Sequence, residues 1–137
     1  MIKVKWDLEE AVVLYDLYFK SGATLSVDTE KLNELSAIMK NRAAVKGVQI
    51  DEKYRNVTGL TMQIGCIHYV VTDGKEGLSN VSKIFYEAYD LYKKEPMKFN
   101  QMIEEFLNQN RGEIEALAHE IFDYAEIAEQ EVKSSCA

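Results

Sequence analysis

The helix expected from Asp7 to Lys20 constrains the fold more than any other part of the chain. Asp7 can accept hydrogen bonds from the free amides of the first turn, and Glu10, in the third helical position, completes a capping box. Beyond these, polar side chains remain only at Glu9, Asp16 and Lys20. A helix that is apolar almost all round must be covered on several sides, so we expect it at the centre of a helical bundle.

Capping signals and apolar spacing predict further helices along the chain. A second helix follows Asp28 and ends near residue 47, and a third runs from about 59 to 71 with Asn56 or Thr58 as its cap. A fourth runs from about 81 to 94, a fifth begins at Pro96, and the last begins after a capping-box pattern at residues 110–113. Residues 48–50 or 69–71 could form a short strand, but no convincing strand alternation occurs. We predict an all-α, compact bundle of five to six helices with a helix-turn-helix-like central segment.

Length and composition favour a single domain over residues 1–137, with a core of residues 1–95 and an acidic C-terminal helical pair at 96–137. The chain has 137 residues, of which 47% are hydrophobic, enough to bury a substantial core. Its two cysteines lack the spacing of metal ligands, and Cys66 is expected in the core. With no apolar run of membrane-spanning length, we expect a soluble cytoplasmic protein with no membrane partner, metal or cofactor.

The charge is distributed unevenly along the sequence. The net charge is −7, but residues 1–70 contain 9 basic and 9 acidic side chains, so the excess of acid lies in the second half. A local basic patch is predicted just before residue 59, formed by Lys40, Arg42, Lys46, Lys53 and Arg55. Any duplex would be directed to this patch and away from the acidic C-terminal segment.

Three segments resemble a helical domain that precedes HNH nuclease domains in bacterial restriction-type proteins. They are Trp6-Asp7-Leu8-Glu9-Glu10 with the following apolar residues, Tyr54-Arg55-Asn56-Val57-Thr58-Gly59-Leu60-Thr61-Met62-Gln63, and Gly77-Leu78 followed by Ser82-Lys83. The resemblance covers roughly residues 4–95 and implies a DNA-reading accessory domain whose cutting is done by a separate nuclease domain. The chain departs from that pattern at Cys66, often a short polar residue there, and at Gln63, often basic.

The helix near residues 59–71 is the candidate for contact with double-stranded DNA. At 100° per residue, Thr61, Gly65, His68 and Thr72 should lie opposite its apolar face and be small enough to approach a major groove. Glutamine can pair with adenine, and the segment before the helix could hold phosphates. The candidate contacts are Arg55, Asn56, Thr58, Thr61, Gln63, His68 and Lys83. The alternative is an ordinary solvated face with Arg55 in an ion pair.

Catalysis is poorly supported by the sequence, so we expect no enzyme and no catalytic residue. HNH chemistry needs histidines around a metal, and the two histidines, His68 and His119, are far apart in the chain. His119 and Asp123 lie one helical turn apart but lack the second histidine of the helical zinc signature. The alternative function is a protein-interaction module that binds a nuclease or toxin through its acidic last helix or the 74–77 loop. The last helix could also form a homodimer seam.

Overall fold

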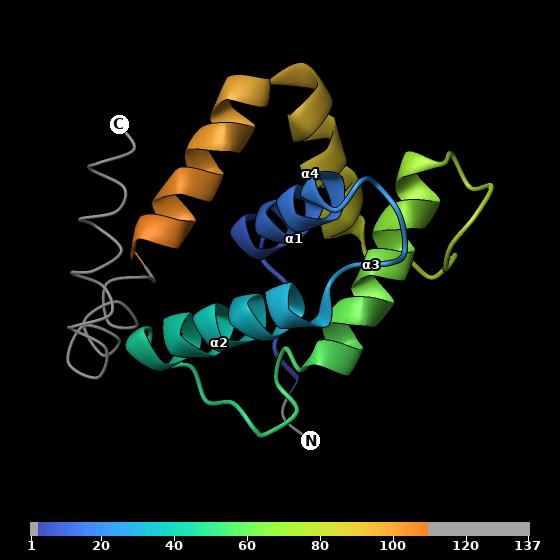
Figure 1. The fold of residues 1–137 in the computed structure, drawn as a ribbon. Coiled ribbons are helices and arrows are strands. Elements are labelled where there is room, and N and C mark those ends of the chain that lie inside the picture. The colour runs from blue at the N-terminus through green and yellow to red at the C-terminus, as the bar shows by residue number, and fades with distance from the viewer. Residues whose placement is uncertain (1–2, 110–137) are drawn as a thin grey trace, which may run out of the picture.

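The computed structural model describes residues 3–109, and its helices surround a central one (Figure 1). The elements are α1 (Leu8–Lys20), α2 (Thr29–Val45), α3 (Val57–Val71) and α4 (Lys83–Lys94), and residues 96–109 are also helical. No strand occurs within residues 3–109, so the predicted all-α bundle is confirmed and residues 48–50 and 69–71 form no strand. The predicted last helix, its capping box and its dimer seam lie outside the described residues.

The capping box at the start of α1 is confirmed. The Glu10 amide donates to Asp7 Oδ1 at 2.8 Å, and the Asp7 amide donates to Glu10 Oε1 at 3.2 Å. Every residue from Ala11 to Tyr15 is buried, and α1 packs against both α3 and α4. The central position expected from its apolar sequence is therefore the one it takes.

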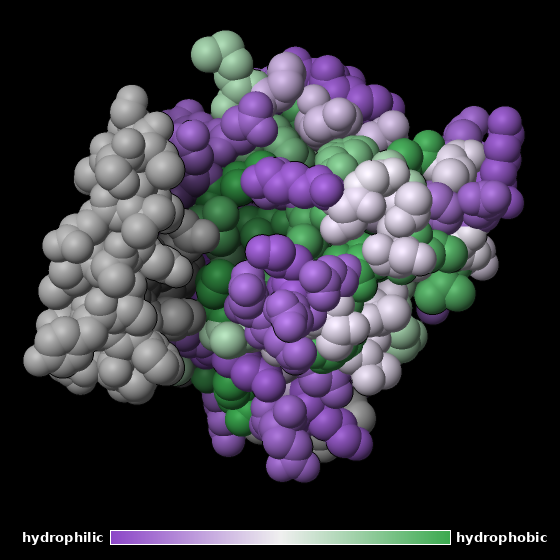
Figure 2. Space-filling model, viewed as in Figure 1, coloured by the Kyte–Doolittle hydropathy of each residue, from purple (hydrophilic) through white to green (hydrophobic). Residues whose placement is uncertain are grey.

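The hydrophobic core extends from α1 into every described helix. Phe99, Ile103 and Phe106 bring residues 96–109 into this core, so this segment packs with the preceding helices as one unit. The buried Tyr15 satisfies its hydroxyl by donating to the Phe85 carbonyl at 2.7 Å, as a buried phenol requires. Figure 2 shows polar side chains along α2 and residues 96–109, with apolar residues gathered in the hollow between them.

Two helix starts differ slightly from expectation because of their caps. The Asn56 side chain accepts from the Gly59 amide at 2.8 Å, so α3 begins at Val57 and Thr58 is not its cap. Ser82 occupies the N-cap position of α4, which therefore begins at Lys83. Asp28 caps α2 as predicted.

The loop formed by residues 72–82 folds back against α3. Its first part, residues 72–77, is the loop predicted from its two glycines. The Leu78 amide donates to the Gly65 carbonyl at 3.0 Å. Gly77 has a φ of +101°, and a Cβ added there would collide with the Gly65 carbonyl oxygen and the Tyr69 amide. Only glycine fits this position, because both the backbone conformation and the lack of space exclude a side chain.

Gly77→Ala is expected to lower the free energy of unfolding by about 2 to 4 kcal/mol, since left-handed backbone strain and overpacking add. Chemical denaturation measures this change. Gly47→Ala is the matched control, because Gly47 has a φ of +71° but an added Cβ meets nothing within 4 Å. The control should lose only about 1 kcal/mol. Equal losses would show that close packing at Gly77 contributes nothing.

Candidate functional site

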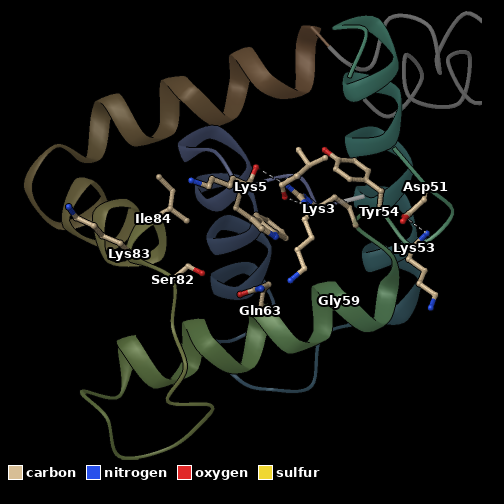
Figure 3. A pocket seen from close by; sticks show the side chains of 13 residues that line it. Lys3, Lys5, Asp51, Lys53, Tyr54, Gly59, Gln63, Ser82, Lys83 and Ile84 are labelled. Atoms are coloured by element: carbon tan, nitrogen blue, oxygen red, sulfur yellow. Dashed lines mark hydrogen bonds between the residues drawn. The ribbon is translucent and has the colours of Figure 1, made fainter. Parts of the chain in front are cut away.

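An open cleft of about 670 Å³ lies where the N-terminal segment, the turn at 51–55, α3 and the start of α4 meet (Figure 3). Four lysines from separate parts of the sequence line it: Lys3, Lys5, Lys53 and Lys83. We call this the lysine cleft. Among residues 3–109, Arg55 also lines the cleft, and Asp51 is the single carboxylate that does so. The lining therefore combines five positive charges with one negative charge.

The four lysines are exposed, and within residues 3–109 none forms an ion pair with a carboxylate. In Figure 3, Lys53 and Lys83 lie at opposite ends of the lysine cleft, and Lys3 lies between them with its amine directed toward α3. Unpaired ammonium groups that share one concave surface reinforce each other's potential. The arrangement can attract an anionic ligand that extends along the cleft.

Arg55 lies beneath the lysine cleft in a buried ion pair. Its Nε donates to Glu10 Oε2 at 2.7 Å and its second terminal nitrogen donates to Glu10 Oε1 at 3.0 Å. The exposed fractions of the two side chains are 7% and 2%. The expectation that Arg55 holds phosphate is corrected, because its guanidinium is already used by Glu10. The ion pair named as the alternative is the observed state.

The remaining donors of Arg55 fix the N-terminal segment. They reach the carbonyls of Val4 at 3.2 Å and Lys5 at 3.1 Å, and the guanidinium lies 4.5 Å from the centre of the Trp6 ring. Arg55 therefore positions residues 3–6 along one wall of the lysine cleft. Burial, with the charge of nearby Glu10, raises the pKa of Tyr54 to about 12, so its hydroxyl stays protonated and donates to Glu10.

The predicted outward face of α3 is wrong at Gly65 and His68, both of which are buried. His68 Nδ1 lies 2.7 Å from the Tyr18 hydroxyl, and His68 Nε2 lies 2.8 Å from Glu76 Oε2. The physical reason is the 72–82 loop, which covers this side of α3 and supplies Glu76. His68 is thus a structural residue with both ring nitrogens engaged, and it is unavailable to DNA.

Apart from His68, the predicted DNA contacts divide into two groups. Arg55, Gln63 and Lys83 line the lysine cleft, whereas Asn56, Thr58 and Thr61 do not. Asn56 is occupied as the cap of α3, and the Thr61 hydroxyl donates to the Val57 carbonyl at 2.8 Å. The contacts therefore do not form the continuous outward face that helical periodicity predicted.

The predicted basic patch is also dispersed. Arg42 donates to Asp7 Oδ2 at 2.7 Å and lies 5.0 Å from the centre of the Phe106 ring, so its charge is paired. Lys40 and Lys46 do not line the lysine cleft. Sequence reasoning missed Lys3 and Lys5, although the alternation Lys3-Val4-Lys5 directly before the capped helix was an available signal.

Gln63 has an unusual environment on α3. Its Oε1 is buried and has no hydrogen-bond partner within residues 3–109. A buried carbonyl without a donor costs about 1–3 kcal/mol, so this atom requires an explanation. The Ser82 hydroxyl makes no capping bond to α4, and Figure 3 shows Ser82 and Gln63 directed toward one another. Ser82 is exposed, and the Gln63 side chain borders the lysine cleft beside it.

Within residues 3–109, histidine, cysteine and carboxylate side chains do not gather in groups of three at which a metal could bind. No helix in the same range has the length and apolar character needed to cross a bilayer. Comparison of the chain with family models, curated proteins and solved structures finds no match.

Proposed function

We propose that this protein is a non-catalytic, DNA-binding accessory module that contacts phosphates through the lysine cleft. The observation that carries the proposal is the convergence on one concave surface of four exposed lysines that form no ion pair within residues 3–109. Contacts from lysine and arginine to phosphates supply nearly all of the affinity in non-specific DNA binding and a large share in specific binding. Because the whole chain is acidic, with a net charge of −7, a duplex should be attracted at this cleft and repelled elsewhere.

The resemblance to domains that precede HNH nucleases adds a second line of support. Each of its three segments contributes to the lysine cleft. The contributing residues are Trp6 from the first segment, Tyr54, Arg55, Gly59 and Gln63 from the second, and Ser82 and Lys83 from the third. Segments far apart in sequence thus meet at one place, as a common binding role would require. We propose that cutting, where it occurs, belongs to a separate nuclease.

Binding to a labelled duplex across a series of salt concentrations tests the proposal. Fluorescence anisotropy on the full chain should report binding that weakens as salt rises, with a logarithmic slope of about −0.9 for each phosphate contacted. A single strand of the same sequence serves as the second ligand. If neither DNA binds at the lowest salt concentration, the proposed function is wrong.

A protein-interaction module is the second candidate, and exposed apolar side chains favour it. Met62 and Leu78 are 57% and 47% exposed and line the same cleft beside α3, and Met97 is 86% exposed. Exposed apolar groups that lie together can mark a protein interface. A partner that copurifies with the parent chain but is lost in Met62→Ser/Leu78→Ser, with no DNA binding at low salt, would favour this candidate.

A further inference from the structure

A second cleft of about 470 Å³ adjoins the lysine cleft, and the two share Gln63 and Ser82. Half of its lining is apolar, from Met62, Cys66, Leu78 and Val81, and Ser79 and Asn80 add polar groups to Gln63 and Ser82. A cationic surface therefore borders a partly apolar one, with Gln63 at the junction. A single nucleotide has the same two parts, an anionic phosphate and a flat, largely apolar base.

The buried Oε1 of Gln63 indicates the chemistry of the missing group. This atom accepts no hydrogen bond within residues 3–109, and native proteins leave few buried acceptors unsatisfied. Gln63 lines both clefts, so a ligand at their junction would contact its amide, and rotation of that amide on binding would let the carbonyl pair with a donor. The ligand should therefore offer an N–H donor beside its negative charge.

We propose that the junction at Gln63 binds one unpaired base of a DNA strand whose phosphates lie against the lysine cleft. This proposal rests on the proposed function. In a duplex, the donors on the Watson–Crick edges are engaged by the opposite base. Adenine, cytosine, guanine and thymine each expose an N–H donor on that edge once the base leaves the stack. The second amino hydrogens of adenine and cytosine stay free in a duplex, but they lie within the major groove. A recessed carbonyl acceptor therefore favours an unpaired base without selecting its identity.

The apolar lining of the second cleft is consistent with this occupant. An unstacked base loses its contacts with neighbouring bases and regains contact when apolar side chains cover its faces. Met62 and Leu78 are positioned for this role because both are exposed and both line the second cleft. A base pair within a duplex could not enter the second cleft, since its edges are recessed in the grooves.

Single-stranded oligonucleotides containing thymidine or N3-methylthymidine test the proposal, because the methyl group replaces the N–H donor of the base. By fluorescence anisotropy, the full chain should bind the unmethylated strand about tenfold more tightly, the ratio expected for one buried hydrogen bond. Gln63→Met keeps the side-chain length and should abolish this ratio while leaving the salt dependence unchanged. Gln49→Met, an exposed position outside both clefts, is the matched control and should keep the ratio.

The outcomes separate this inference from the proposed function. Equal, salt-sensitive binding of the two strands by the parent chain overturns the role of Gln63 and leaves DNA binding intact. A ratio that persists in Gln63→Met also overturns it, because steric exclusion of the methyl group would then explain the difference. Absence of binding to either strand, and to the duplex, at low salt overturns both proposals.

Discussion

Arg55→Met is expected to lower the free energy of unfolding by about 3 to 5 kcal/mol, the cost of leaving one partner of a buried ion pair unpaired. The substitution strands the Glu10 carboxylate, which is 2% exposed and receives two hydrogen bonds from Arg55. It also releases the carbonyls of Val4 and Lys5. A domain of this size is stable by only about 5 to 15 kcal/mol, so urea denaturation should detect a large shift.

Arg42→Met is the matched control for this prediction. Arg42 also pairs with a carboxylate, but the Asp7 side chain is 40% exposed and water can solvate it when the arginine is removed. The expected loss is about 1 to 2 kcal/mol, because the ion pair is partly solvated but Arg42 also gives up its contact with the Phe106 ring. If the two variants lost the same stability, the buried pair between Arg55 and Glu10 would not have the structural role described above.

Removal of the four cleft lysines is expected to have the largest effect on DNA binding. The variant Lys3→Gln/Lys5→Gln/Lys53→Gln/Lys83→Gln should bind a duplex between about a hundredfold and a thousandfold more weakly, since each lysine contact contributes on the order of 0.7 to 1 kcal/mol. The slope of log affinity against log salt should become shallower by about 3 to 4, because four phosphate contacts are lost. Anisotropy titrations measure both quantities.

The matched control changes the same number of charges elsewhere. Lys46, Lys75, Lys94 and Lys98 are exposed and lie outside both clefts. Their fourfold substitution by glutamine alters the net charge equally, so it should reduce affinity only slightly and leave the salt slope nearly unchanged. Equal loss in both variants would mean that overall charge, and not the lysine cleft, governs binding.

The helices could be predicted from the sequence because their signals are local. The capping box of Asp7 and Glu10, the cap at Asp28 and the apolar character of α1 each depend on residues within a few positions. Capping bonds and helical periodicity involve residues within a few turns of one another, so the sequence alone can indicate them. The predicted start of α3 is two residues late because two cap candidates, Asn56 and Thr58, lie only two positions apart.

The candidate site could be predicted only in part, because its geometry depends on contacts between distant residues. Glu10 was recognised as part of a capping box, but its pairing with Arg55, 45 residues away, leaves no local signal. The burial of His68 follows from a loop that folds back on α3, which helical periodicity cannot reveal. Gln63 and Lys83 were identified, whereas Lys3 and Lys5 join them only through the tertiary fold.

The central claim is that DNA phosphates lie against the lysine cleft, and mapping the contact surface tests it most directly. Amide chemical shifts of the isotope-labelled full chain, recorded during titration with DNA at low salt, report which residues are affected. The largest changes should occur at residues 3–6, 51–55 and 82–84, with little change at residues 96–109. Changes centred on residues 96–109, with residues 3–6 and 82–84 unaffected, would contradict the claim.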